Sequence, residues 1–186
     1  MTKKTERKAL LIIDVINSFQ FDQGKILAEK TKEICPQILK MKEFCKENDF
    51  PIIYINDHYY LWKADIDKII NHCMNDISAP IIQQLKPKED DYFLIKPKHS
   101  AFYGTALNTL LHQLDVDSLI ITGIAGNICV LFTANDAYMR EYDLYIPEDG
   151  MTSVREQDDA YTLEMMKNVL NADTRPIDEY IKNNPS

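Results

Sequence analysis

The chain has 186 residues, of which 45% are hydrophobic and 27% charged, ordinary values for a globular protein, and it is long enough to form one hydrophobic core. We therefore expect a single domain over residues 1–186. The net charge of −8 argues against a nucleic-acid partner, because binding phosphate needs a basic face. No segment approaches the roughly 20 apolar residues of a membrane span, and the start does not resemble a signal peptide.

Apolar runs and helical spacing alternate along the chain. The runs predict strands at residues 9–13, 51–55, 92–95, 119–122 and 143–146, and the spacing predicts helices at 27–48, 105–114, 127–141 and 156–170. Residues 19–24 and 57–62 are expected to be loops, residues 78–85 a surface connection, and the tail from residue 172 a short edge strand. Strands separated by helices predict a mostly parallel sheet covered on both faces.

The four cysteines lie at positions 35, 45, 73 and 129, without a CxxC pair or metal-ligand spacing. This pattern suits free thiols in a reducing compartment, so we expect a cytoplasmic protein. Cys45 follows the apolar stripe of its predicted helix and is expected in the core. Cys129 is the one cysteine with a chemical argument behind it.

Cys129 lies in the segment SLIITGIAGNICVLFTANDAYMR, which reads as a buried strand, a glycine-containing turn and a helix that begins near a capping Asn127. In the first turn of a helix, the positive end of the helix dipole favours the thiolate and lowers the pKa of the thiol. The free N–H groups there can also receive an oxyanion. The alternative is that Cys129 simply packs in the core, as most free cysteines do.

Two further side chains directly follow predicted strands. Asp14 comes after the first strand and Lys96 after the third. Ligands bind at the carboxyl ends of parallel strands, so a carboxylate, an ammonium and a thiol are delivered to one edge of the sheet. Asp14 could instead form a turn, and Lys96 could point into water. Together, the three favour covalent hydrolysis. Dinucleotide binding is not supported, since no GxGxxG follows the first strand, and no P-loop is present.

Three blocks of the chain, LLIIDVINSF, LIKPKHSAFYGTALNTLL and GIAGNICVLFTANDAYMREYDLYIPEDG, resemble the signature blocks of the isochorismatase-like cysteine hydrolase superfamily. They occur in the family's order, and the resemblance covers about residues 8–170. The superfamily includes nicotinamidases, N-carbamoylsarcosine amidases, ureidoacrylate amidases and isochorismatases. The resemblance implies an α/β fold, a three-layer α/β/α sandwich with a six-stranded, mostly parallel Rossmann-like sheet.

The resemblance also implies how the site works. It assigns a catalytic triad to Asp14, Lys96 and Cys129, a cis peptide bond between Ile124 and Ala125, and an oxyanion hole to the backbone N–H groups of Ala125 and Cys129. In the implied mechanism, Asp14 takes the thiol proton, the sulfur attacks a carbonyl and a thioester forms. Relatives that cleave a vinyl ether lack the cysteine, so Cys129 favours an amide, ureido or related acyl bond.

The substrate is less well specified than the chemistry. We expect the pocket to be lined by Phe19, Tyr59, Trp62, His99, Phe102 and Ile124. The aromatic residues at positions 59, 60 and 62 could cap a small planar substrate or form a subunit interface. The family often has Gln two residues after the catalytic Asp, where this chain has Ile16.

Nicotinamidases carry a metal site that begins with Asp-x-His, whereas here Asp57 and His58 are adjacent, and His72 is the remaining candidate ligand. We therefore expect no metal and no cofactor, with a metal-assisted nicotinamidase as an alternative. A second alternative is a non-catalytic binding or scaffold domain of the same fold. The expected partner is a small-molecule substrate, and the resemblance suggests a homodimer or homotetramer.

Overall fold

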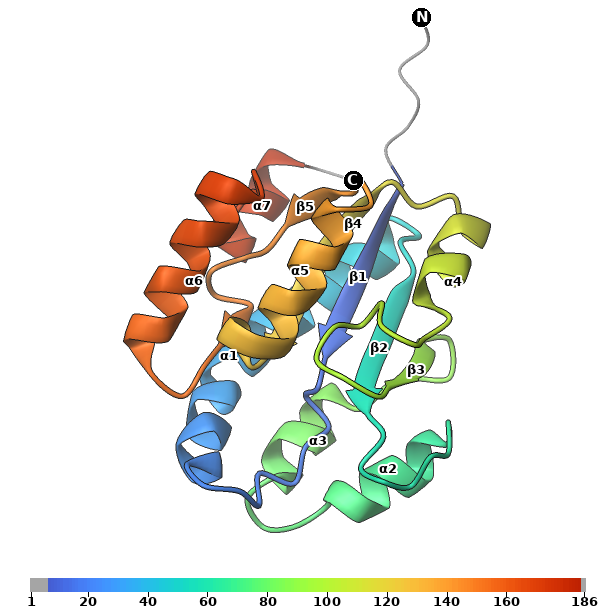
Figure 1. Ribbon diagram of the computed structural model, residues 1–186, viewed down its shortest axis with the longest axis vertical. Coiled ribbons are helices and arrows are strands. Elements are labelled where there is room, and N and C mark those ends of the chain that lie inside the picture. Colours follow the sequence, from blue (N-terminus) through green and yellow to red (C-terminus); the bar gives the residue numbers. More distant parts are fainter. Residues whose placement is uncertain (1–6, 185–186) are drawn as a thin grey trace, which may run out of the picture.

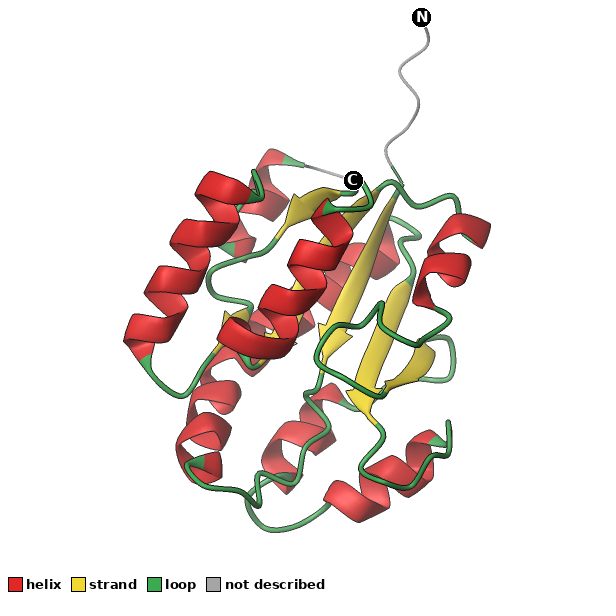
Figure 2. Cartoon of the chain, viewed as in Figure 1, coloured by secondary structure: helices red, strands yellow, loops and turns green. Residues whose placement is uncertain are grey.

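The computed structural model describes residues 7–184 and contains a parallel sheet between two layers of helices (Figures 1 and 2). The strands are β1 (Lys8–Ile13), β2 (Ile52–Asp57), β3 (Tyr92–Lys96), β4 (Ser118–Ile124), β5 (Asp143–Tyr145) and β6 (Met151–Thr152). The helices are α1 (Gly24–Glu47), α2 (Ile66–Cys73), α3 (Ala79–Leu85), α4 (Leu107–Gln113), α5 (Leu131–Tyr138), α6 (Glu156–Val169) and α7 (Ile177–Asn183). A single turn of π-helix, Gly126–Val130, leads into α5 and is called the wide turn below.

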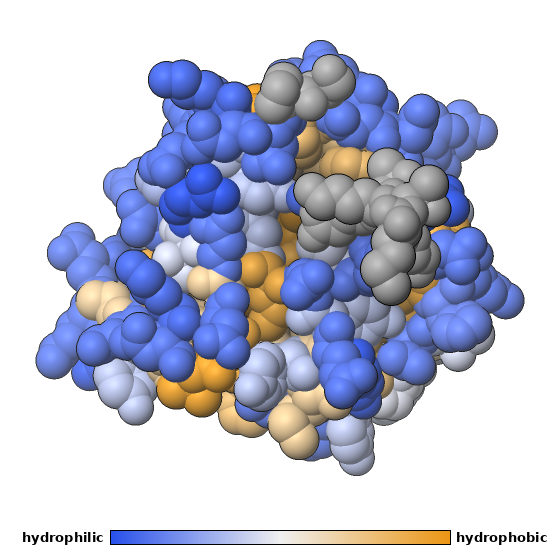
Figure 3. Space-filling view, turned by 90° about the horizontal axis from the view of Figure 1, so that it is seen from above, coloured by the Kyte–Doolittle hydropathy of each residue, from blue (hydrophilic) through white to orange (hydrophobic). Residues whose placement is uncertain are grey.

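Five strands of the six-stranded sheet lie in the order β3-β2-β1-β4-β5. The sixth strand, β6, pairs with Gly123 and Ile124 at the carboxyl end of β4. Every recorded pairing between these strands is parallel. Parallel strands all end at the same edge, toward which the arrows of β1 and β2 point downward in Figure 1. The opposite end of the molecule, seen in Figure 3, presents mainly hydrophilic side chains. Strand geometry therefore brings the ends of β1, β3 and β4 to one place.

Alternating side chains of each strand fill two separate cores. On one face, Leu10 and Ile12 pack with residues of α1, α2, α3 and α7. On the other, Ala9, Leu11 and Ile13 pack with residues of α4, α5 and α6. The predicted three-layer α/β/α sandwich is confirmed. No helix within residues 7–184 is long and apolar enough to cross a membrane.

Three segments differ from the predictions. Residues 78–85, expected as a surface connection, form α3, which buries Ile81, Ile82 and Leu85 against the α1 side of the sheet. The sixth strand is β6 rather than the tail, in which Asp173 forms a single bridge with Tyr145. The tail then continues into α7, which was not predicted. All three segments are too short for periodicity to identify them.

Gly123 holds β4 close to β1. Its φ of 116° lies in the region that favours glycine, and a Cβ here would press against the backbone carbonyl of Ile13. Because Asp14 follows Ile13 directly, this contact also fixes the distance between the end of β1 and the turn that carries Cys129.

Gly123→Ala should therefore lower the free energy of unfolding by about 3 kcal/mol or more, through strain at positive φ and a backbone clash. Urea denaturation followed by circular dichroism measures the change. Met139→Ala, at an exposed position directly after α5, should change it by less than about 0.5 kcal/mol. Equal stabilities for Gly123→Ala and the parent protein would contradict the close approach.

Candidate active site

Three side chains from three strand ends meet at the carboxyl edge of the sheet. The Lys96 ammonium lies 2.8 Å from Asp14 Oδ2 and 3.5 Å from Cys129 Sγ. The side chains of Lys96 and Asp14 are 1% and 8% exposed, so the ion pair is almost completely removed from solvent. The juxtaposition expected for Asp14, Lys96 and Cys129 is thus present.

Asp14 is held by the backbone around it. Its own N–H donates to the Ile55 carbonyl at 3.0 Å, and its Oδ1 accepts the Asp57 N–H at 2.8 Å. Its φ of 54° is uncommon for a residue other than glycine and turns the chain sharply after β1. With Oδ1 bound to the backbone and Oδ2 to Lys96, the carboxylate has one fixed orientation.

Lys96 is the last residue of β3 and pairs in register with Asp57 of β2. Its Nζ also donates to the Lys98 carbonyl at 3.1 Å. Burial alone would lower the pKa of Lys96, but the Asp14 carboxylate in contact with it raises this pKa above its ordinary value overall. Lys96 therefore stays a cation beside the sulfur.

The Gly126–Val130 turn has an unusual hydrogen-bond pattern. The Ile128 and Val130 N–H groups both donate to the Ala125 carbonyl, at 3.0 and 3.2 Å, and the Cys129 N–H between them is not among its donors. Such wide turns are rare and often occur at functional sites. The peptide bond between Ile124 and Ala125 is cis, as the resemblance implied.

The start of this turn is fixed by Ser153, which precedes α6, and by Asp158 in the first turn of α6. Ser153 Oγ accepts the Asn127 N–H at 2.9 Å, and Asn127 Nδ2 donates to Asp158 Oδ2 at 3.3 Å. The prediction that Asn127 caps the helix is wrong, because the turn begins after Ala125 and no side-chain cap is present there. The Ser153 hydroxyl, from a segment distant in sequence, instead accepts a hydrogen bond from one of the N–H groups at the start of the turn.

The prediction of a lowered thiol pKa is also wrong. Burial first, and the Asp14 carboxylate second, raise the pKa of the Cys129 thiol above its ordinary value, and the Lys96 ammonium opposes them only in part. The sulfur is therefore protonated at rest near neutral pH. Reaction at this thiol requires a neighbouring group that accepts its proton, and Asp14 is the carboxylate in place to do so.

A cavity of about 490 Å³ opens onto Asp14 and Cys129. Of the six expected pocket residues, Tyr59, His99 and Ile124 line it. His99 Nδ1 lies 3.9 Å from Cys129 Sγ. The Tyr59 hydroxyl donates to the Ile16 carbonyl at 2.8 Å, which fixes the ring in the wall.

The other three expected pocket residues lie elsewhere. Phe19 is 2% exposed and belongs to the core on the α1 side. Phe102 is 6% exposed and packs with the ring of Tyr142 and the guanidinium of Arg140. Trp62 is 65% exposed and stacks on His58. Aromatic rings in core and surface loops gave the same sequence signal as rings in a pocket.

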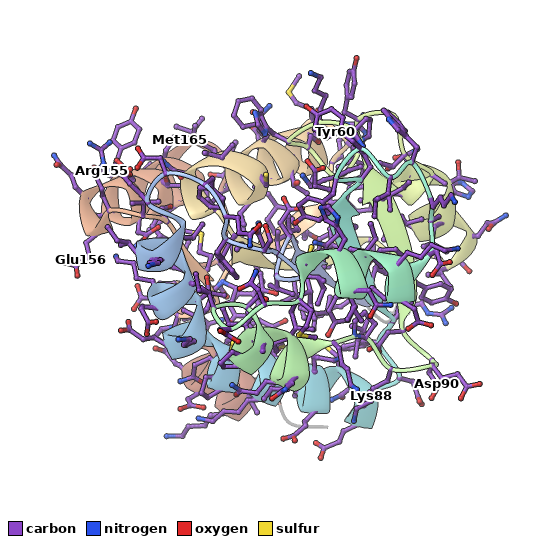
Figure 4. The ribbon with its side chains drawn as sticks, turned by 90° about the horizontal axis from the view of Figure 1, so that it is seen from below. Tyr60, Lys88, Asp90, Arg155, Glu156 and Met165 are labelled. Atoms are coloured by element: carbon purple, nitrogen blue, oxygen red, sulfur yellow. The ribbon has the colours of Figure 1, made fainter. Side chains whose placement is uncertain are left out.

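Most of the cavity wall was missed by the sequence analysis. Figure 4 looks onto this edge of the sheet, with Arg155 at the upper left and Tyr60 at the top of the view. The additional lining residues come from the loop before α1 and its first turn, the end of β2, the Gly126–Val130 turn and the start of α6; they are Asn17, Phe21, Gln23, Leu27, Asp57, Asn127, Ile128, Val154, Arg155 and Asp158. Ala125, which was expected in the oxyanion hole, also lines the cavity. The position of Asn17 and Asp57 shortly after strands was the one signal available for them.

The residues considered for a metal site do not assemble one. His58 Nδ1 accepts the Tyr60 N–H at 2.9 Å, and its ring stacks on Trp62. His72 lies against the ring of Tyr59, and Asp57 Oδ1 accepts the Tyr59 N–H at 2.7 Å. Within residues 7–184, no group of three or more His, Cys, Asp or Glu side chains is placed to hold a metal ion. The donor set therefore does not fit the metal centre of the nicotinamidase alternative.

The chain is thus a parallel α/β/α sandwich with a thiol, a carboxylate and an ammonium at its carboxyl edge. Comparison with known proteins identifies its family. The model of the isochorismatase domain matches residues 8–175. The chain therefore belongs to the isochorismatase family, and the protein is an isochorismatase-family hydrolase.

Relatives extend over the whole fold. The chain is 58% identical over 175 residues to the uncharacterized isochorismatase family protein YaaI of Bacillus subtilis, covering 94% of this chain and 97% of YaaI. It is 26% identical to an isochorismatase-like hydrolase from Alkaliphilus metalliredigens, with a TM-score of 0.77 and coverage of 96% and 99%. It is 25% identical to N-carbamoylsarcosine amidase from Thermoplasma acidophilum, with a TM-score of 0.68 and coverage of 92% and 97%.

The raised thiol pKa leads to a prediction. Alkylation of Cys129 by iodoacetamide should keep accelerating past pH 9, because only the thiolate reacts. Lys96→Gln removes the ammonium beside the sulfur, raises the thiol pKa further and should slow alkylation at pH 8 by about tenfold. Mass spectrometry of the Cys129 peptide gives the rates.

Lys42→Gln provides the matched control, since Lys42 is also buried but pairs with Asp91. It should leave the alkylation rate of Cys129 unchanged. A rate that levels off below pH 8, or an unaltered rate in Lys96→Gln, would contradict the electrostatic description of this site.

Proposed function

We propose that the protein is a cysteine-dependent hydrolase that cleaves an amide, ureido or related C–N bond of a small molecule through a thioester. The observation that carries the proposal is the position of the Lys96 ammonium, in contact with both the Asp14 carboxylate and the Cys129 sulfur beside a cavity. The cavity has the volume of a small-molecule site.

In the first step, Asp14 accepts the thiol proton and Lys96 stabilises the thiolate. Cys129 Sγ attacks the carbonyl carbon of the substrate, and the N–H groups of Ala125 and Cys129 bind the oxygen that becomes negative. In the wide turn, the N–H groups of Ile128 and Val130 donate to the Ala125 carbonyl and the Cys129 N–H does not, which supports its part in this role. Asp14 then gives its proton to the leaving nitrogen as the C–N bond breaks, which leaves a thioester.

In the second step, a water molecule attacks the thioester. Asp14 takes a proton from this water, and the tetrahedral intermediate occupies the same pair of N–H groups. The C–S bond then breaks to release the acid, and Asp14 returns its proton to the departing sulfur, which restores the thiol and the carboxylate. A positioned general base contributes about 10²–10⁴-fold to such a reaction, and one oxyanion donor about 10²–10³-fold.

The test is a panel of amides, ureido acids and nicotinamide screened for release of ammonia or acid. Cys129→Ala should lower turnover by about 10³-fold or more, and Asp14→Asn by about 10²–10⁴-fold, both with an unchanged circular dichroism spectrum. Cys35→Ala, which changes a cysteine buried in α1, should retain turnover. Hydrolysis that persists in Cys129→Ala would exclude the thioester mechanism.

A further inference from the structure

The charges that line the cavity indicate what kind of molecule it accepts. Arg155, at the start of α6, lines the cavity, but its Nε and Nη2 donate to the two carboxylate oxygens of Asp158, at 3.0 and 2.9 Å. Lys96 is paired with Asp14 in the same way. Both permanent cations of the site are therefore matched by a carboxylate, and neither is left over for an anionic substrate.

One carboxylate of the cavity wall has no such partner. Asp57 lines the cavity at the end of β2, and among residues 7–184 no ion pair to it is recorded. Its Oδ1 accepts the Tyr59 N–H, and its negative charge is close enough to Lys96 to help raise the pKa of that ammonium. The wall therefore carries an excess negative charge on the side of Asp57.

Three side-chain amides, those of Asn17, Gln23 and Asn127, also line the cavity. Asn17 Oδ1 accepts the Phe19 N–H, and Asn127 Nδ2 donates to Asp158. Within residues 7–184, the Gln23 side chain makes no hydrogen bond. A carboxylate and a side-chain amide suit a ligand group that donates N–H hydrogen bonds without carrying a negative charge. A ligand carboxylate here would face Asp57 without a cation to compensate it.

We propose that this site selects an uncharged carboxamide or ureide and discriminates against substrates that carry a carboxylate near the scissile bond. This inference rests on the proposed function for the reaction, and it adds the charge class of the substrate. The specificity-determining residues are Asp57 and Asp158: the first by its unpaired charge, and the second by neutralising Arg155.

The test needs no turnover and so is independent of the proposed mechanism. Iodoacetamide and iodoacetate present the same electrophilic carbon, one without charge and one with a carboxylate. The measured quantity is the alkylation rate with iodoacetamide divided by the rate with iodoacetate. At pH 8, this rate ratio at Cys129 should exceed the rate ratio for N-acetylcysteine by about tenfold. Cys35, Cys45 and Cys73 are buried, so alkylation of the folded protein reports on Cys129.

Two variants locate the effect. Asp57→Asn removes the unpaired charge, and Asp158→Asn releases Arg155; each should lower the rate ratio by about threefold or more. Asp178→Asn, which removes a carboxylate paired with Lys40 on α7, should leave the ratio unchanged. His99→Gln is included because His99 also faces the sulfur, and the preference for iodoacetamide should persist in it.

A ratio equal to or below that of N-acetylcysteine in the parent protein would overturn the proposal. So would a ratio that stays high in both Asp57→Asn and Asp158→Asn. Either result would leave the thioester mechanism intact, because that mechanism is tested by turnover in Cys129→Ala.

Discussion

The buried ion pair between Lys96 and Asp14 is the interaction on which the site depends. Removing two charges from water costs several kcal/mol per ion, and the cost is recovered only when geometry and further hydrogen bonds are good. Here the carboxylate also accepts a backbone N–H from β2, and the ammonium donates to a backbone carbonyl after β3. Breaking the pair would strand a charge in the core, so the sheet holds both partners in one arrangement.

This arrangement also sets the state of the sulfur. A thiol beside a lone ammonium would ionise readily, but here the ammonium is already matched by a carboxylate. The net charge next to the sulfur is therefore small, and burial dominates. The site therefore holds a neutral thiol next to a proton acceptor, Asp14, rather than a preformed thiolate. Because a neutral thiol is a poor nucleophile, the half-buried cysteine does not react with every electrophile that enters the cavity.

The fold and the three residues Asp14, Lys96 and Cys129 could be predicted from the sequence. The fold follows from the periodicity of hydrophobic residues, and the three residues follow from their positions at or just after the ends of strands. Apolar runs separated by helical spacing define parallel strands, and residues directly after such strands share an edge, which brought Asp14, Lys96 and Cys129 together. The thiol pKa could not be predicted, because it depends on burial and on a partner 115 positions away in the chain. Three of the six expected pocket residues do not line the cavity, because rings such as Phe19 and Phe102 look the same in sequence as pocket aromatics. Arg155, which does line it, belongs to no motif.

The cavity and the reacting trio are built from different parts of the chain. The trio stands on the ends of β1, β3 and β4, inside the sheet, whereas much of the outer wall comes from the loop before α1 and the first residues of α6. Wall residues such as Phe21 and Arg155 are exposed and carry little of the folding energy. Substitutions at these surface positions can therefore change which molecules enter the cavity, in evolution or in protein engineering. The three reacting side chains inside the sheet stay the same.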